Sequence, residues 1–284
     1  MGARVRAMLS RLSRWFRINI NRALGKRTLM TNQESWLAFG AKLLNVCEAI
    51  LHQAEIPEEG RSTPDPRLVA LTLMCRTVNN FAALRLLVEN EFIIEARTLV
   101  RCCWENLFWI GGLTADGHGF VKRMIGEDVT SKLKRGNELL EWARKVDFEG
   151  DLTSFLAKLK AENPKQTKIS FQSEAQAGNV GDGYIVYRVL STDAAHPSAT
   201  SLSRHYELDE SCGASGETLR GTPIIDAGEI EETLEFACSA LLGVCVGTNK
   251  LVGGTPAGEQ LADLFQEFRK LSDASKVART KGCN

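Results

Sequence analysis

The sequence predicts an all-α protein, a multi-helix bundle, from two observations. Hydrophobic residues make up 44% of the 284 positions, which is enough to bury the core of a large helical domain. Along most of the chain these residues recur at spacings of three and four, the period of an amphipathic helix, and only one short region alternates. We therefore expect one helical bundle domain over residues 31–273, between a basic N-terminal helix (1–27) and a polar tail (274–284).

The first 27 residues differ in charge from the rest of the chain. They contain eight basic residues and no acidic residue, although the whole chain has a formal net charge of zero. The remaining residues therefore carry a net charge of −8. Val5, Met8, Leu12 and Phe16 are among the apolar residues that recur at helical spacing in this segment. The segment is thus predicted to be an amphipathic helix with an arginine-rich face.

Three interpretations of residues 1–27 remain open. Arginines opposite an apolar face that contains Trp15 and Phe16 suit the surface of an anionic membrane. Packing of the segment on the acidic remainder, or on a second subunit of a homo-oligomer, would also explain the opposite charges. Organellar transit peptides share the same Arg-rich, acid-poor composition.

The first half of the chain predicts long helices separated by clear breaks. Thr31 and Glu34 form a capping-box pattern before a helix over about 32–56. A Pro- and Gly-containing loop follows it. The next four helices are expected over about 67–89, 91–113, 119–146 and 151–162.

The second half begins with a polar stretch, Gln172 to Gly183, which we expect to be a loop. A helix follows it and should stop before Pro197. Residues 203–223 alternate weakly and predict an irregular segment or a small hairpin. Asp226 is a candidate cap for a helix over about 227–251, and Pro256 begins a last helix that extends to about 272.

The eight cysteines form no Cys-x-x-Cys pair, and most lie within apolar helical runs. We interpret them as small core residues in a reducing compartment, which predicts a cytoplasmic protein, peripheral at the membrane if residues 1–27 bind there. No histidine or cysteine cluster has the spacing of metal ligands, and no glycine-rich loop has the pattern of a nucleotide site. We therefore expect neither a metal nor a cofactor.

Arg97, Arg101 and Glu105 form a charged line at i, i+4 and i+8 on one of the most apolar helices. Charges on a buried helix must be paired or must face a cavity, because an isolated buried ion is costly. These three residues are our candidates for ligand binding. The alternative is a solvated stripe or an internal ion-pair network.

The second candidate group lies in the segment Tyr184 to Ser198. Tyr187 and Arg188 are on a predicted helix, and Pro197 should force His196 out of the α region at the end of that helix. His196, Arg188 and Tyr187 are our candidates for catalysis. We expect them to converge with Arg97, Arg101 and Glu105 on one polar pocket between helices. The alternative for His196 is a helix-terminal histidine that hydrogen-bonds to the last carbonyl groups.

These two motifs, Ala-Arg-x-Leu-x-Arg and Tyr…Ser…His-Pro-Ser, resemble a family of largely uncharacterised, all-helical bacterial proteins described only as a domain of unknown function. The resemblance covers about residues 35–250. It implies a helical fold and no particular activity.

A weaker similarity is to the helical superfamily of higher eukaryote and prokaryote nucleotide-binding domains. Metal-independent ribonucleases of that superfamily use an arginine and a histidine near a helix end. The similarity implies that His196 exchanges a proton with the RNA and that Arg188 stabilises phosphate charge. RNA or a phosphate-containing ligand is thus the expected partner. The alternative is a non-enzymatic interaction module that binds a membrane surface or a partner through residues 1–27.

Overall fold

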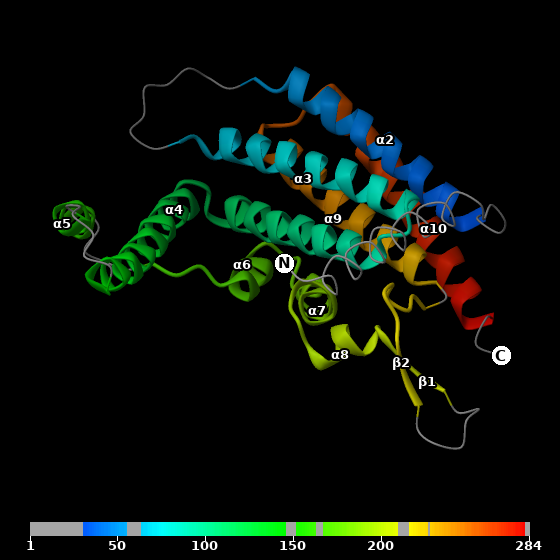
Figure 1. The fold of residues 1–284 in the computed structure, drawn as a ribbon. Coiled ribbons are helices and arrows are strands. Elements are labelled where there is room, and N and C mark those ends of the chain that lie inside the picture. The colour runs from blue at the N-terminus through cyan, green and yellow to red at the C-terminus, as the bar shows by residue number, and fades with distance from the viewer. Residues whose placement is uncertain are drawn as a thin grey trace.

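A computed structural model describes residues 31–55, 64–145, 152–162, 167–209, 216–226 and 228–281. Helices dominate the described chain, as predicted (Figure 1). The long helices are α2 (Thr31–Gln53), α3 (Pro66–Glu89), α4 (Ile93–Lys145), α9 (Glu229–Leu251) and α10 (Leu261–Lys281). The shorter ones are α5 (Leu152–Glu162), α6 (Phe171–Ala177), α7 (Gly183–Leu190), the π-helical turn η1 (Ser191–Ala195), α8 (Ala199–Ser203) and the 3₁₀ turn η3 (Pro256–Gln260).

The core lies where α3, the first half of α4 and α9 pack together, with α2 and α10 covering α9 (Figure 1). Fully buried aromatic side chains from three of these helices fill it, among them Phe39, Phe81 and Phe108. Burial of this apolar surface is the main force that holds the bundle together. The all-α prediction is therefore confirmed.

Helix α4 replaces two helices that the sequence predicts as separate. Its backbone leaves helical geometry at Asp116 (φ −150°, ψ 60°), so the expected break is a kink inside one run. Arg123 Nη1 donates to Asp116 Oδ2 across the kink at 2.6 Å. A side chain at Gly119 would collide with the Asp116 carboxylate, so glycine permits this geometry. The second half of α4 packs against α5 in a small separate cluster.

The predicted loop between Gln172 and Gly183 was wrong in its first part, because helix α6 occupies Phe171–Ala177. Ser170 Oγ caps this helix by accepting from the Ser173 N–H. Glu174 and Ala175 are buried against α4. Tertiary burial explains why so polar a sequence is helical here.

The hairpin predicted within residues 203–223 is present. β1 (Tyr206–Asp209) pairs antiparallel with β2 (Gly216–Leu219), and Tyr206 lies opposite Leu219. The final helix, α10, continues to Lys281 rather than ending near residue 272, so most of the tail expected over 274–284 is helical.

The start of α9 differs from its predicted cap. Gly228 is the N-cap residue, with φ +85°, and the helix begins at Glu229. The Asp226 carboxylate does not cap the helix. Instead the Glu229 side chain accepts from the Asp226 N–H at 3.0 Å. This hydrogen bond holds the Glu229 carboxylate beside the site described below.

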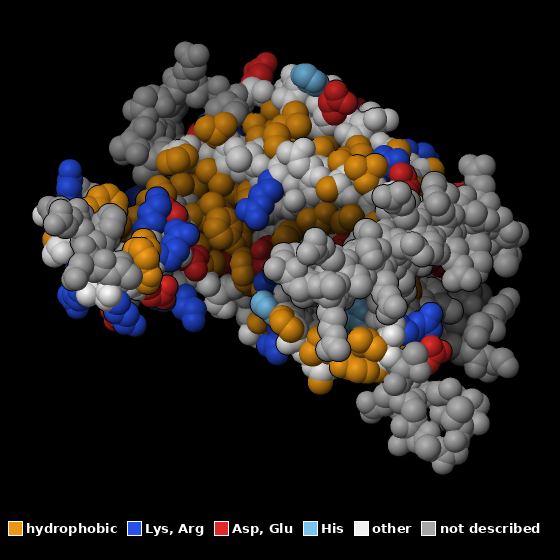
Figure 2. All heavy atoms as spheres, viewed as in Figure 1, with side chains coloured by type: hydrophobic (Ala, Val, Ile, Leu, Met, Phe, Trp, Pro, Cys, Tyr) orange, Lys and Arg blue, Asp and Glu red, His pale blue; other side chains and the backbone are white. Residues whose placement is uncertain are grey.

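The amphipathic helix predicted over residues 1–27 lies outside the described residues. Among the helices that the structure does describe, none is long and apolar enough to cross a membrane. Hydrophobic side chains are nevertheless visible on the surface over α3 and α4 (Figure 2). The large exposed ones on these two helices and the turn between them are Leu68, Leu86, Phe92, Ile125, Leu139 and Trp142.

Candidate functional site

Arg97 is the centre of a buried group of charges. Its side chain is only 4% exposed and comes from the first half of α4. Arg97 Nε lies 3.0 Å from Asp193 Oδ2, and Nη1 lies 3.5 Å from Glu229 Oε1 and 2.9 Å from Glu232 Oε2. The predicted need of a buried arginine for partners is thus met by carboxylates that are distant in sequence.

Arg204, at the end of α8, faces the same carboxylates. It donates from two nitrogens to Asp193, at 2.8 and 2.9 Å, and from two to Glu229, at 3.0 and 2.7 Å. Such two-point contacts are the strongest geometry available to arginine. Burial lowers the pKa of Arg204, but the hydrogen bonds to Glu229 and Asp193 outweigh it, so the pKa lies above its ordinary value.

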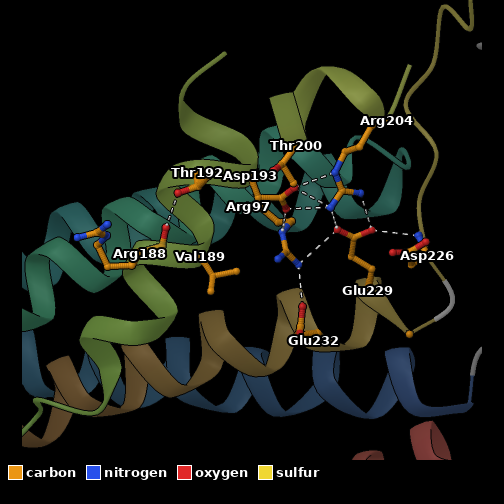
Figure 3. Close-up of a pocket in the computed structure, with 11 residues that line it drawn as sticks. Arg97, Arg188, Val189, Thr192, Asp193, Thr200, Arg204, Asp226, Glu229 and Glu232 are labelled. Atoms are coloured by element: carbon orange, nitrogen blue, oxygen red, sulfur yellow. Dashed lines mark hydrogen bonds and ion pairs between the residues drawn. The ribbon is translucent and has the colours of Figure 1, made fainter. Parts of the chain in front are cut away.

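Arg97, Asp193, Arg204 and Glu229 therefore form a closed ring of alternating charges, which we call the ion ring (Figure 3). Each member pairs with two of the others. The ring joins α4, η1, the end of α8 and the start of α9. Glu232 adds a further carboxylate, so the group carries one more negative than positive charge.

The π-helical turn η1 presents Asp193 to the ring. Asp193 is 6% exposed, and the wider turn is fastened to α4 because Thr98 Oγ1 donates to Ala194 O at 3.3 Å. π-helical turns are uncommon in proteins, but those that occur often lie at functional sites. No sequence signal predicted this turn, because its residues also suit an ordinary helix end.

The His-Pro-Ser motif ends the turn. His196 has an extended backbone (φ −127°, ψ 143°), as Pro197 was predicted to impose. Ser198 Oγ then accepts from the Ser201 N–H at 3.0 Å and donates to Thr192 O at 2.7 Å. Ser198 is therefore the N-cap residue of α8, and the serine of the motif stabilises the start of that helix.

Beside the ion ring is a cleft of about 640 Å³. Three arginines and four carboxylates line it, together with the Thr192 and Thr200 side chains. The cleft includes Arg97 and Arg188 from the predicted site, but Arg188 points away from the ring in Figure 3. The carboxylates thus outnumber the arginines, and two of the arginines are already paired.

The other predicted residues lie outside this cleft. Arg101 Nη2 donates to Tyr187 Oη at 3.1 Å and pairs with Glu105 at 2.9 Å, in a separate half-buried group. Burial lowers the pKa of Arg101, but the hydrogen bond to Tyr187 and the charge of Glu105 raise it above its ordinary value. The exposed His196 side chain is not among the residues that line the cleft.

A second, larger cavity of about 830 Å³ was missed from the sequence. It lies between α4, the α6–α7 turn, α9 and α10, and its lining is mostly apolar. Val246 and Phe265 are about half exposed at this cavity. Across the described residues, no group of three or more metal-ligating side chains has the geometry to hold a metal ion.

The model of one protein family, described as a family of unknown function (DUF5677), matches residues 67–214. This match covers more than half of the chain. The chain belongs to the DUF5677 family. No curated protein and no solved structure matches it.

The DUF5677 assignment confirms the predicted likeness to an uncharacterised domain, over a shorter range than the 35–250 expected. The similarity to the nucleotide-binding superfamily stays a prediction. The DUF5677 match contains Arg97, Asp193 and Arg204 but ends before Glu229 and Glu232. The ion ring thus connects the family region to the helix that follows it.

Proposed function

We propose that this protein is a non-catalytic interaction module, which the ion ring holds in shape and which binds through its basic N-terminal segment. The observation that carries the proposal is the closure of the ring. Arg97 and Arg204 are neutralised by the buried Asp193 and Glu229 carboxylates, and Arg97 also by the partly exposed Glu232, so neither is available for a substrate phosphate. Recognition of an anion requires cations that are not already paired.

The geometry around His196 also favours a structural role for this region. The backbone carbonyl of His196 accepts from Ser201 Oγ at 3.0 Å, within the cap of α8. A general base must lie within hydrogen-bond reach of the proton that it takes. The exposed His196 imidazole is not among the residues that line the cleft, so the two do not form one catalytic group. This supports a binding function rather than an enzymatic one.

Residues 1–27 supply the binding element in this proposal. Their eight basic residues are attracted to a negative surface, and each contributes on the order of 1 kcal/mol near anionic headgroups. The apolar side chains of the segment, which include Trp15 and Phe16, add hydrophobic burial at the interface. An anionic membrane surface is therefore the proposed partner, and an acidic protein surface or a second copy is the alternative.

We expect the 284-residue chain to co-sediment with vesicles that contain about 30% phosphatidylserine, and deletion of residues 1–27 to abolish this binding. Raising the salt concentration should weaken binding, because ions screen attraction between separated charges. Vesicle sedimentation at two salt concentrations measures both effects. Neutral phosphatidylcholine vesicles are the matched control.

Binding that survives the deletion would contradict the proposed role of the segment. A better-matched variant keeps the length and the apolar residues of the segment and replaces Arg11, Arg14 and Arg17 by glutamine. This variant should bind anionic vesicles more weakly at unchanged melting temperature. Loss of a homodimer, rather than of vesicle binding, would identify a second copy as the partner.

A phosphate or RNA ligand is the second candidate, and Arg188 favours it. This arginine lines the cleft with an exposed side chain and is not a member of the ion ring. The hydroxyl groups of Thr192 and Thr200 line the same cleft and could donate to a phosphate. In this function the protein is a metal-independent ribonuclease that uses His196 as acid and base and Arg188 for phosphate charge.

If the protein is such a ribonuclease, it should cleave mixed cellular RNA in the presence of a metal chelator. His196→Ala should remove at least 100-fold of that activity, about the contribution of one acid–base group. Gel analysis of the RNA beside thermal melts of both proteins measures this, with His205→Ala as the control. Equal RNA patterns with and without the protein would reject this function and leave the interaction module.

A further inference from the structure

Two fully buried thiols meet between α2 and α9. Cys47 comes from α2 and Cys245 from α9, and both have 0% exposure. Their Sγ atoms are 2.8 Å apart although 198 positions separate them in the sequence. The two helices pack along each other in the core, so the contact is set by the bundle and not by a mobile loop.

This distance is close to that of a covalent bond between sulfurs. A disulfide has an S–S length of about 2.05 Å, so the two atoms need to approach by less than about 1 Å. Burial alone does not distinguish this pair, because Cys103 and Cys238 are equally buried. The contact that Cys238 Sγ makes is with a backbone oxygen, that of Trp36, at 3.8 Å.

We propose that Cys47 and Cys245 are a modification site, which a low-molecular-weight disulfide oxidises to an intramolecular disulfide that joins α2 to α9. This inference is independent of the proposed binding function. It changes the interpretation of these two cysteines from simple core residues to a reactive pair.

The reaction proceeds by two exchanges. One protein thiol loses its proton, attacks a sulfur of the oxidant and forms a mixed disulfide, which releases one thiolate of the oxidant. The second protein thiol then loses its proton and attacks the protein sulfur of the mixed disulfide. The Cys47–Cys245 bond forms, the second oxidant thiolate leaves, and the two protons end on the two released thiols. The two electrons pass from the protein thiols to the oxidant.

Burial makes this reaction slow. The hydrogen bond to Cys47 and burial both raise the pKa of Cys245, so the attacking thiolate is scarce. The oxidant also reaches the pair only when the core opens locally. Cys75, which is exposed on α3, provides the comparison because it needs no opening.

The test uses the 284-residue chain and a small neutral oxidant, bis(2-hydroxyethyl) disulfide. After incubation, free thiols are blocked with N-ethylmaleimide in denaturant, and the protein is digested without reduction. The tryptic peptide that ends at Lys250 contains both Cys238 and Cys245, so chymotrypsin is added to separate them at Leu241 and Leu242. Mass spectrometry should then find Cys47 and Cys245 in one cross-linked species, two hydrogens lighter than its separate peptides.

The oxidised protein should also melt higher, by roughly 5–10 °C, because the bond closes a long loop of the unfolded chain. A reducing phosphine should reverse the shift. Cys47→Ala and Cys245→Ala should each abolish the cross-link and the shift, whereas Cys75→Ala should keep both. Mapping of the wild type is decisive even if an alanine variant fails to fold.

Two results would overturn the proposal. One is recovery of Cys47 and Cys245 as maleimide adducts after Cys75 has fully reacted with the oxidant and the protein has been held near its melting midpoint. The other is a cross-link that joins either cysteine to a different partner.

Discussion

Replacing Arg97 by methionine is expected to lower the free energy of unfolding by about 3–5 kcal/mol. Methionine keeps most of the length of the side chain and removes its charge. The buried Asp193 and Glu229 would then share Arg204 as the remaining ring cation, and the partly exposed Glu232 would lose its pairing with Arg97. An uncompensated buried carboxylate is costly because it has lost its water. Urea unfolding followed by circular dichroism measures the change.

Lys42→Met is the matched control for Arg97→Met. Lys42 pairs with Glu267 at 2.7 Å, but its side chain is 55% exposed. Surface pairs of this kind contribute about 0–1 kcal/mol, so the control should be nearly neutral. An equally small loss for Arg97→Met would contradict the interpretation of the ion ring as a buried structural network.

A second substitution tests how much of the stability loss of Arg97→Met comes from the lost charge rather than from altered packing. In the Arg97→Met background, Glu229→Gln removes a carboxylate that has lost one of its two arginine partners. We expect the double variant to be less destabilised than the sum of the two single variants, because the second change relieves a penalty that the first created. Additive losses would mean that Arg97 and Glu229, which lie 3.5 Å apart, are not energetically coupled.

The sequence predicts the helices of this protein better than their ends or their bends. Periodic apolar residues locate α2, α3 and α9 because each buries one long face. The pattern fails at α6, whose seven residues are too few to show a period. It also fails at the start of α9, where the cap depends on a left-handed Gly228 and on the Glu229 side chain.

The candidate site shows the same limit more strongly. The sequence identifies Arg97 as a charge on an apolar helix, and a buried arginine must have partners. It cannot say which partners, because Asp193, Arg204 and Glu229 come from three other elements. Their approach depends on a π-helical turn, a short helix and an irregular connection. Arg101, four residues from Arg97, carries an equivalent signal in the sequence yet belongs to the separate group with Tyr187.

Truncation of Phe81 to alanine should be among the most destabilising changes in the core, with a loss of about 3–5 kcal/mol. Phe81 has 0% exposure on α3, and its ring lies against the backbone of Gly40 on α2. A Cβ atom at Gly40 would be 2.6 Å from Phe81 Cζ, which is closer than packed atoms approach. Phe92→Ala is the control, because Phe92 is 48% exposed.

From the contact between Phe81 and Gly40 we also predict the sign of the stability change that Gly40→Ala causes in two backgrounds. In the wild type, Gly40→Ala should cost about 1–3 kcal/mol, because the added methyl group overpacks the core. In the Phe81→Ala background the same change should instead stabilise the protein, since the methyl group enters vacated space and alanine favours a helix by about 1 kcal/mol over glycine. Urea unfolding of the four proteins measures both effects. An equal loss in both backgrounds would show that another neighbour, not the Phe81 ring, requires glycine where α2 crosses α3.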